Sequence, residues 1–259
     1  ALDPANIALP ERARLLRPRV LSRLSWTPPY AYDRDRRREL SLRARELAKP
    51  GDLLSSGDAV LALHGAMSAP EDLAEAEKLN PELERVCTEG PVSITAFEAR
   101  LCRHDTSLRL CDGDDVVRQV QLMGRIARDL RIPEVSWTYQ RLELQTSFYE
   151  GDLTRVEASL RSLYSSSQQY RIRFGRGYAC VCESRLRRER GVGLDPKLAD
   201  DPARERGGSM LEEPAMPAAR VWVLREAAEA GRTDYARTEL ARLARSRFTD
   251  QPRDALLLA

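Results

Sequence analysis

The chain has 259 residues, of which 42% are hydrophobic and 32% charged, and its 42 basic and 40 acidic residues leave a formal net charge of +2. This composition is typical of a folded globular protein and excludes an intrinsically disordered one. The near balance of charge also gives no reason to expect direct binding of nucleic acid, which is associated with a clear basic excess.

The sequence contains no segment that predicts insertion into a membrane. No apolar run approaches the ~20 residues that a bilayer-spanning helix needs. Residues 1–16 place prolines and charges where the apolar part of a signal peptide would lie. We therefore expect a cytoplasmic protein with no membrane partner.

Residues 1–90 are predicted to form a less regular series of helices. Apolar residues recur at steps of three and four, as at Leu40, Ala44 and Leu47, which is the spacing of one helix face. Pairs of proline and glycine at 50–51 and 90–91 interrupt the pattern. With the helix that follows residue 90, the candidate helices are 11–24, 34–49, 52–66, 70–87 and 92–110.

Further along the chain a repeat becomes visible. The stretch YEGDLTRVEASLRSLYSSS is matched about eighty residues later by EAGRTDYARTELARLARSRF. Each copy has a turn glycine, Gly151 or Gly231, followed by small or apolar residues five, nine and twelve positions later. Coincident positions of this kind indicate a repeated packing unit. They are Val156, Leu160 and Leu163 in one copy and Ala236, Leu240 and Leu243 in the other.

Two further glycines fit the same spacing. Gly191 lies 40 residues from both Gly151 and Gly231, and Gly113 lies 38 residues before Gly151, with an apolar stripe that is shifted against the other two. A helix is expected between Pro133 and Gly151, because proline is tolerated at a helix start and glycine favours the turn that ends one. The repeated unit is therefore a helical hairpin of about forty residues.

The helix expected after Gly191 is missing from the pattern. Pro196, Pro202 and the glycine pair at 207–208 break up this segment. We therefore predict a loop over 191–213.

A single helical hairpin cannot bury its apolar stripe, whereas hairpins stacked side by side bury their stripes against each other. The sequence therefore predicts an all-α fold, a right-handed superhelix (solenoid) of stacked antiparallel hairpins with a concave face. We expect one helical-repeat domain over 1–259, with the less regular helices in 1–90 and the repeats in 91–259. No stretch alternates apolar and polar residues well enough to predict a strand.

The turn glycine, the small residue five positions on and the apolar residues at nine and twelve resemble the second half of a tetratricopeptide repeat. Two features depart from that family. Leu144 and Leu224 stand where its first helix normally has a small residue, and the spacing of about forty exceeds the usual 34 or so. The fold that this resemblance implies is therefore tetratricopeptide-like.

Four segments carry a more particular resemblance: RRRELSLRARELAKPGDLLSSGDAVLAL, LRLCDGDDVV, FYEGDLTRVEASL and AGRTDYARTELARLARSRFTDQPRDALLLA. Their order resembles the helical-repeat sensor region of large bacterial ATP-binding regulators, the LuxR-type activators related to MalT, and similar parts of adenylate cyclase-like signalling proteins. The resemblance implies a module of transcription regulation or signal transduction. In such proteins it would follow an ATPase module, whose phosphate-loop motif G-x-x-x-x-G-K-[ST] does not occur in this chain.

No catalytic or metal-binding motif is present in the sequence. G-x-S-x-G and H-E-x-x-H are missing, and the two histidines and five cysteines lack the spacing of a four-ligand zinc site. His104 falls on an apolar helix stripe and is expected to be buried and hydrogen-bonded. The cysteines are expected to be small buried apolar residues. We therefore predict a protein that is not an enzyme and has no metal or cofactor.

Binding is predicted on the concave side, where stacked hairpins place the first helix of each pair. Arginine suits this role because its guanidinium binds carboxylate or phosphate in a bidentate manner and stacks on aromatic rings. Arg185 and Arg225 share one offset from their turn glycines, which places them to line one groove. The full candidate set is Trp137, Tyr139, Arg141, Arg173, Tyr178, Arg185 and Arg225.

The expected partner is a protein segment or a small effector. An alternative for the same residues is that the aromatic side chains pack between helices and the arginines are only solvated. An alternative for the whole chain is a structural scaffold that self-associates through its terminal helices.

Overall fold

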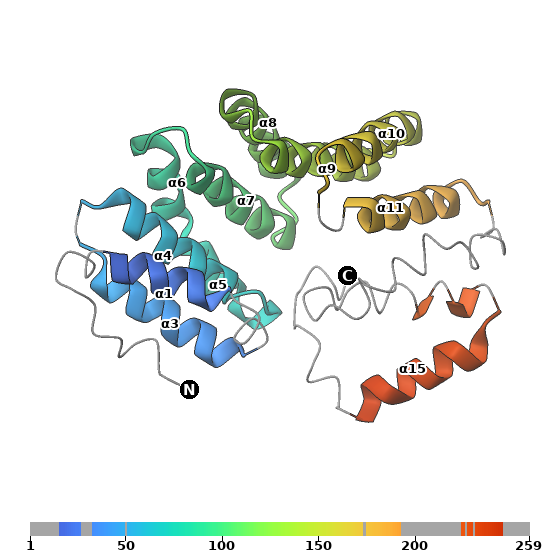
Figure 1. The fold of residues 1–259 in the computed structure, drawn as a ribbon, viewed down its shortest axis with the longest axis horizontal. Helices are drawn as coiled ribbons and strands as arrows, with labels where there is room; N and C mark the ends of the chain where they lie inside the picture. The colour runs from blue at the N-terminus through green and yellow to red at the C-terminus, as the bar shows by residue number, and fades with distance from the viewer. Residues whose placement is uncertain are drawn as a thin grey trace. The chain divides into compact units, whose positions relative to one another are not determined.

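The computed structural model describes residues 16–26, 33–49, 51–172, 175–192, 224–225, 227–229 and 231–245. Within these ranges every regular element is a helix and no strand occurs (Figure 1), which confirms the all-α prediction. None of the helices in this described part is long and apolar enough to cross a membrane.

The chain divides into two compact units, Ala1–Val135 with Arg253–Ala259, and Ser136–Pro252. The organisation of the whole chain as one continuous domain stays a prediction.

In the first unit several helices begin at a side-chain cap. Asp33 accepts a hydrogen bond from the backbone N–H of Arg36, and Asp52 accepts one from Ser55. Such caps stabilise a helix start because the first-turn N–H groups have no partner within the helix. The elements of this unit are α1 (Arg17–Ser25), α3 (Arg34–Leu47), α4 (Leu53–Gly65), η3 (Pro70–Asp72), α5 (Leu73–Glu77), α6 (Asn80–Glu89), α7 (Ile94–Arg109) and α8 (Gly113–Leu130).

Two apolar clusters form the core of the first unit. In the first cluster, Leu21 of α1 packs with Leu40 and Ala44 of α3 and with Ala59 of α4. The second lies among α4, α5, α6 and α7, and its buried members are Val60, Leu61, Leu63, Met67, Ala76, Leu79, Leu83, Val86 and Ala99.

The arginine-rich helix α3 is paired with acidic residues that come about 37 positions later in the chain. Arg34 is 3.3 Å from Glu71 and also binds Asp72, and the remaining pairs are Arg38 with Glu75 and Arg45 with Glu82. The basic cluster at 34–38 is therefore a neutralised helix face, as expected for a solvated surface, rather than a free basic patch.

The second unit contains α9 (Pro133–Tyr149) from Ser136 onward, α10 (Leu153–Gln169), α11 (Gly175–Glu189) and α15 (Thr233–Arg245). Helix α10 lies close to α11, since a Cβ at Gly175 would be only 2.5 Å from the Cβ of Ser167. The apolar cluster that joins α9, α10 and α11 consists of Leu144, Phe148, Val156, Leu160, Leu163, Ala179, Cys182 and Leu186.

The turns that end the helices recur at a fixed spacing of twenty residues. Residues in the left-handed backbone region, with φ between 51° and 87°, occur at Gly51, Cys111, Arg131, Gly151, Arg171, Gly191 and Gly231. From 111 to 191 they follow one another at every twentieth position. The predicted forty-residue hairpin is thus two helix-plus-turn units of equal length.

This spacing corrects the sequence prediction at Gly113. The left-handed residue of that turn is Cys111, and Gly113 is the first residue of α8, behind the N-cap Asp112. Counted from Cys111, the apolar stripe of α8 is not shifted. Its buried residues Val116, Val120 and Met123 lie five, nine and twelve positions on, at the same offsets as the buried stripe of α10.

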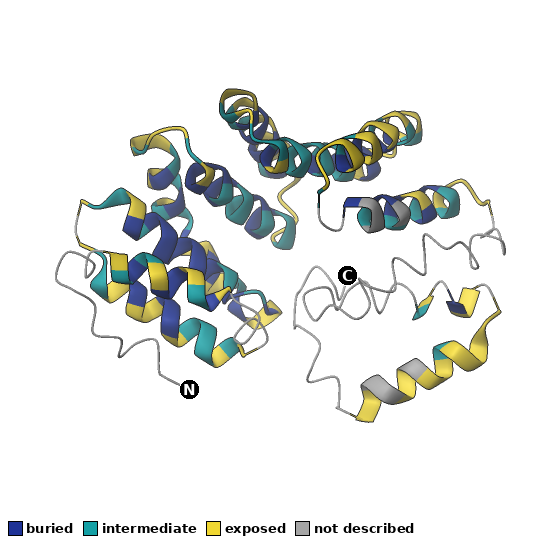
Figure 2. Cartoon of the chain, in the orientation of Figure 1, coloured by how far each residue is buried: buried dark blue, intermediate teal, exposed yellow. Residues whose placement is uncertain are grey.

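Helix α15 is exposed over most of its described length (Figure 2). Of the stripe offsets that are described there, Ala236 is of intermediate burial and Leu240 is exposed. Leu240 is 54% exposed, whereas the equivalent Leu160 of α10 is 9% exposed. The side chain of the third stripe residue, Leu243, lies outside the described residues. The repeat therefore holds in register, but not in burial, at α15.

Two predicted segments differ from the structure or lie beyond it. The helix predicted over 70–87 is broken between α5 and α6, because Pro81 lacks an N–H group and is tolerated only near a helix start. The loop predicted over 191–213 lies, from residue 193 onward, outside the described residues.

Candidate functional site

Helices α9 and α11 bring three of the predicted site residues together. The rings of Trp137 and Tyr178 meet edge to face, with centroids 5.8 Å apart and planes at 77°. The guanidinium carbon of Arg141 lies 5.6 Å from the centroid of Tyr178. Trp137 and Arg141 are four residues apart on α9, so they project from one side of the helix. Both rings rest against the apolar cluster of the second unit.

Arg185 extends this arrangement along the same pair of helices. Its guanidinium carbon lies 4.5 Å from the ring centroid of Phe148 and 6.0 Å from that of Tyr149. Its nearest carboxylate is that of Glu189, at 3.8 Å. Cation–π contacts of this kind hold an arginine in place while leaving its N–H groups free to bind an anion. Together with Gln140, these residues define the α9–α11 surface: Trp137, Gln140, Arg141, Tyr178 and Arg185.

Several polar atoms of this surface are buried without a hydrogen-bond partner. They are Nε1 of Trp137, Oε1 of Gln140 and Nε of Arg141, and Oγ of the neighbouring Ser184 is in the same state. A buried polar group without a partner destabilises the folded state by about 1–3 kcal/mol. Such atoms are not confined to this surface, since Nε of Arg103 and Nε of Arg109 in the first unit are in the same state. What distinguishes the α9–α11 surface is that its unpartnered atoms lie beside aromatic rings.

The charge of Arg141 is also uncompensated in the part of the chain that the structure describes. Arginines in α11 and directly after it have carboxylate partners, such as Arg187 with Glu183 at 3.0 Å and Arg190 with Glu157 at 2.8 Å. Arg141 has the ring of Tyr178 instead.

Tyr178 is held in its neutral form. Burial raises the pKa of its phenol well above the ordinary value, the nearby Cys182 raises it further, and the charge of Arg141 opposes the shift. At neutral pH the ring therefore offers Arg141 a π face without a competing negative charge.

The remaining predicted site residues lie elsewhere. Tyr139 is two positions from Trp137 on α9, which turns it about 200° around the helix, away from Trp137. Arg225 is exposed and binds Glu229 at 2.8 Å, and Glu229 also binds Arg188. The prediction that Arg225 shares a groove with Arg185 stays a prediction, and Arg173 lies outside the described residues.

The structure tests the predicted burial of the histidines and cysteines at the positions whose side chains it describes. His64 and His104 are both buried, which confirms the predicted burial of His104. Cys182 is buried, but Cys111 is exposed in its turn, so the expectation of buried cysteines is wrong there. Within the described ranges, no three histidine, cysteine, aspartate or glutamate side chains are grouped in a way that would hold a metal ion.

Comparison with known proteins finds no matching family model and no similar protein among curated sequences or solved structures. The likeness of the repeats to tetratricopeptide and LuxR-type sensor regions therefore stays a resemblance of pattern.

Proposed function

We propose that this chain is a helical-repeat interaction module that binds a partner segment or a small effector on the α9–α11 surface. The observation that carries the proposal is the set of buried, unpartnered polar atoms on Trp137, Gln140 and Arg141, next to aromatic rings. These atoms are covered, so a ligand reaches them only where the side chains above them move aside, and it would then supply the missing hydrogen bonds.

The donors of this surface define the ligand chemistry that fits best. The indole N–H of Trp137 and the guanidinium of Arg141 both donate hydrogen bonds, which suits a carboxylate. Oε1 of Gln140 is an acceptor and suits an N–H next to that carboxylate, as in a peptide. Arg185 adds a second positive charge further along the surface.

The finer architecture, a right-handed superhelix of stacked hairpins, is part of this proposal. The regular turn spacing and the shared stripe offsets in α8 and α10 support it, because a solenoid repeats the same packing in each unit. By its resemblance to LuxR-type sensor regions, the module would act within a bacterial transcriptional regulator or signalling protein in the cytoplasm, without touching nucleic acid itself.

Fluorescence anisotropy with labelled peptides tests the proposal. One peptide carries glutamates and aromatic residues, and a matched peptide has glutamine in place of each glutamate. We expect saturable binding of the glutamate peptide without turnover, weakened at least about tenfold by Arg141→Glu or Arg185→Glu. The matched control is Arg161→Glu on the exposed face of α10, which should bind as the unaltered chain does. Equal binding of the two peptides, or an equal loss in the control, would contradict the proposal.

A second candidate function is favoured by the exposed stripe of α15. Leu240 occupies an offset that is buried in α8 and α10, so the helix has room for a partner such as another copy of the chain. In this case the protein is a scaffold that self-associates through terminal helices. Light scattering over a concentration series tests it: a scaffold grows with concentration and Leu240→Glu keeps it monomeric, whereas a chain that is monomeric throughout rules the scaffold out.

A further inference from the structure

Two cation–π pairs lie one after the other on the α9–α11 surface. In the first, Arg141 of α9 lies over the ring of Tyr178 of α11, and in the second, Arg185 of α11 lies over the ring of Phe148 of α9. Residue numbers rise on both helices from the first pair to the second, so α9 and α11 run parallel here. Because each arginine reaches across to the other helix, both guanidinium groups lie along the line where α9 and α11 meet.

The two pairs have the same separation on both helices. Arg141 and Phe148 are seven residues apart on α9, and Tyr178 and Arg185 are seven residues apart on α11. Seven residues are nearly two helical turns, so they return a side chain to the same side of the helix. They also advance it by about 10 Å along the axis. We call Arg141 and Arg185, at this separation, the arginine row.

No strong ion pair holds either arginine in the part of the chain that the structure describes. Arg141 has no carboxylate partner there, and Arg185 lies 3.8 Å from Glu189, where both side chains are about half exposed and such a pair is weak. The other acidic side chains of the two helices bind another arginine, face away from the arginine row, or lie beyond its end; they are Glu134, Glu143, Glu150 and Glu183.

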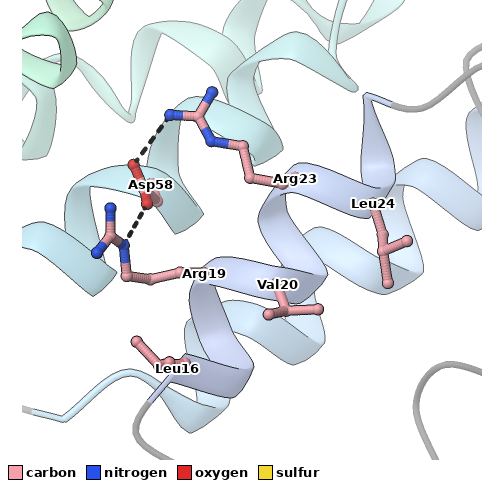
Figure 3. Close-up of a pocket in the computed structure, with 6 residues that line it drawn as sticks. All are labelled: Leu16, Arg19, Val20, Arg23, Leu24 and Asp58. Carbon is pink, nitrogen blue, oxygen red and sulfur yellow. Dashed lines mark hydrogen bonds and ion pairs between the residues drawn. The ribbon is translucent and has the colours of Figure 1, made fainter. Parts of the chain in front are cut away.

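The neighbouring arginines of α1 have different surroundings. Arg19 and Arg23 reach Asp58 of α4 (Figure 3), with Nε of Arg19 2.8 Å from Oδ2 and a terminal nitrogen of Arg23 3.8 Å from Oδ1. Arg23 also lies 4.0 Å from Glu98. An anionic ligand would compete with these carboxylates on α1, whereas the described residues place none beside Arg141.

Aromatic rings accompany the arginine row. Trp137 meets Tyr178 edge to face beside Arg141, and the ring centroid of Tyr149, which is 55% exposed, lies 6.0 Å from the guanidinium carbon of Arg185. Surfaces lined by aromatic rings bind polyproline II segments, which are already extended before they bind. In that conformation, side chains at i and i+3 point the same way and are about 9 Å apart, which is close to the spacing of the arginine row.

On the basis of the proposed function, we infer that the α9–α11 surface takes a polyproline II segment of a partner protein with acidic side chains at positions i and i+3. One carboxylate binds Arg141 and the other binds Arg185. Acidic side chains at other spacings reach only one of the two arginines at a time.

Fluorescently labelled oligoproline peptides measure this spacing, because proline holds the polyproline II conformation. Two peptides of equal length carry a pair of glutamates at i and i+3 or at i and i+6. Both pairs lie on one side of the peptide, but the second is about 19 Å apart. A third peptide has glutamine at i and i+3. We expect the full chain to bind the i, i+3 glutamate peptide at least about tenfold more tightly than either of the others.

Variants of the two arginines test whether both contacts are made at once. Arg141→Gln and Arg185→Gln should each abolish the preference for i, i+3 over i, i+6, because one arginine is left for two carboxylates. The matched control is Arg187→Gln on the same helix, two positions from Arg185 and paired with Glu183, which should keep the preference. Circular dichroism checks the helix content; if Arg141→Gln loses it, Arg185→Gln, at a side chain 43% exposed, is the decisive variant.

Equal binding of the i, i+3 and i, i+6 glutamate peptides, or a preference that survives in Arg185→Gln, would overturn the inferred spacing while leaving the proposed function in place. Binding of none of the oligoproline peptides would also overturn it. If the peptide with glutamates and aromatic residues then fails to bind as well, the proposed function falls with it.

Discussion

Two arginines, the buried Arg100 of the first unit and the half-buried Arg141 of the second, have opposite surroundings. In the first unit, Arg100 of α7 donates to both carboxylate oxygens of Glu84, at 2.6 and 3.0 Å, and lies 3.4 Å from Oε1 of the buried Gln119. In the second unit, Arg141 of α9 rests on the ring of Tyr178, and its buried Nε has no partner.

Under the proposed function, this difference separates polar groups that hold a fold together from groups that are held ready for a ligand. The ion pairs around Arg100 join α6, α7 and α8, since Arg103 of α7 also binds Glu84 and lies 3.9 Å from Asp115 of α8. Ion pairs that join three helices in this way favour one arrangement of those helices, although Nε of Arg103 has no partner of its own. Arg141 has no such ion pair, and a cost in stability of this kind is tolerated where function needs it.

Removing the shared carboxylate of the first unit is expected to have the largest effect. Glu84→Ala leaves Arg100 buried without its ion pair, and breaking a buried pair in this way costs about 3–5 kcal/mol of unfolding free energy. Urea unfolding measures the loss. Glu89→Ala removes an exposed pair with Arg85 on the same helix and should leave stability unchanged. If the two variants were equally stable, the network would not be structural.

A second pair of variants compares the stripes of α10 and α15 within the second unit. Leu163→Ala removes a fully buried side chain and should cost about 2–5 kcal/mol, whereas Leu240→Ala should change stability by less than about 0.5 kcal/mol. Denaturant unfolding of both variants at low protein concentration is the measurement. A large loss in Leu240→Ala would mean that α15 is packed as α10 is.

The first unit should lose stability in acid through His64. Burial, and then the charge of Arg109, lower the pKa of His64 to about 4, and its Nε2 lies 2.9 Å from Oγ1 of Thr106. The unfolded chain binds this proton near pH ~6.5, so the unfolded state holds more protons below that pH. Neutral His64 therefore costs no unfolding free energy above pH ~6.5, and the unfolding free energy falls by up to about 3 kcal/mol as the pH drops towards 4.

Unfolding free energies across this pH range provide the check. His64→Leu should flatten this decline in unfolding free energy relative to the unaltered chain. Both proteins should still lose stability at lower pH, because acidic residues with lowered pKa values, such as Asp115, become protonated there. Parallel pH curves for the two proteins would show that His64 is not buried in its neutral form.

The smallest expected effects concern the turns. A non-glycine residue in the left-handed region costs about 1–2 kcal/mol, so Cys111→Gly should stabilise the chain by about 1 kcal/mol and Gly151→Ala should destabilise it by a similar amount. Thermal unfolding of the two variants is sufficient to see opposite signs. Destabilisation in both would mean that the two turns are not equivalent.

The helices and their stripes could be predicted from the sequence because apolar spacing is set by helix geometry. Val156, Leu160 and Leu163 are buried as their offsets indicate. The full turn spacing could not be found in this way. Cys111, Arg131 and Arg171 adopt the backbone conformation that glycine favours, and such residues leave no compositional signal.

The closeness of Trp137 and Tyr178 could be predicted for the same reason. Trp137 and Tyr178 lie at similar positions of two successive hairpins, so a repeat places them side by side. Tyr139 is predicted with Trp137 because both lie on the first helix of one hairpin, but positions two apart on a helix face different ways. Gln140 is a site residue that the sequence analysis missed, although it lies three residues from Trp137 and therefore on the same side of the helix. Nothing in the sequence indicates that the oxygen of its amide is buried and unpaired.

The most direct test of the central claim is to measure how the two arginines contribute to stability. Methionine fills a similar volume without charge, so Arg100→Met and Arg141→Met can be compared by urea unfolding. If Arg141 is kept for binding, Arg141→Met should raise the unfolding free energy by about 1 kcal/mol, while Arg100→Met lowers it. A loss of stability in Arg141→Met as large as that in Arg100→Met would show that Arg141 serves the fold, and would contradict the account.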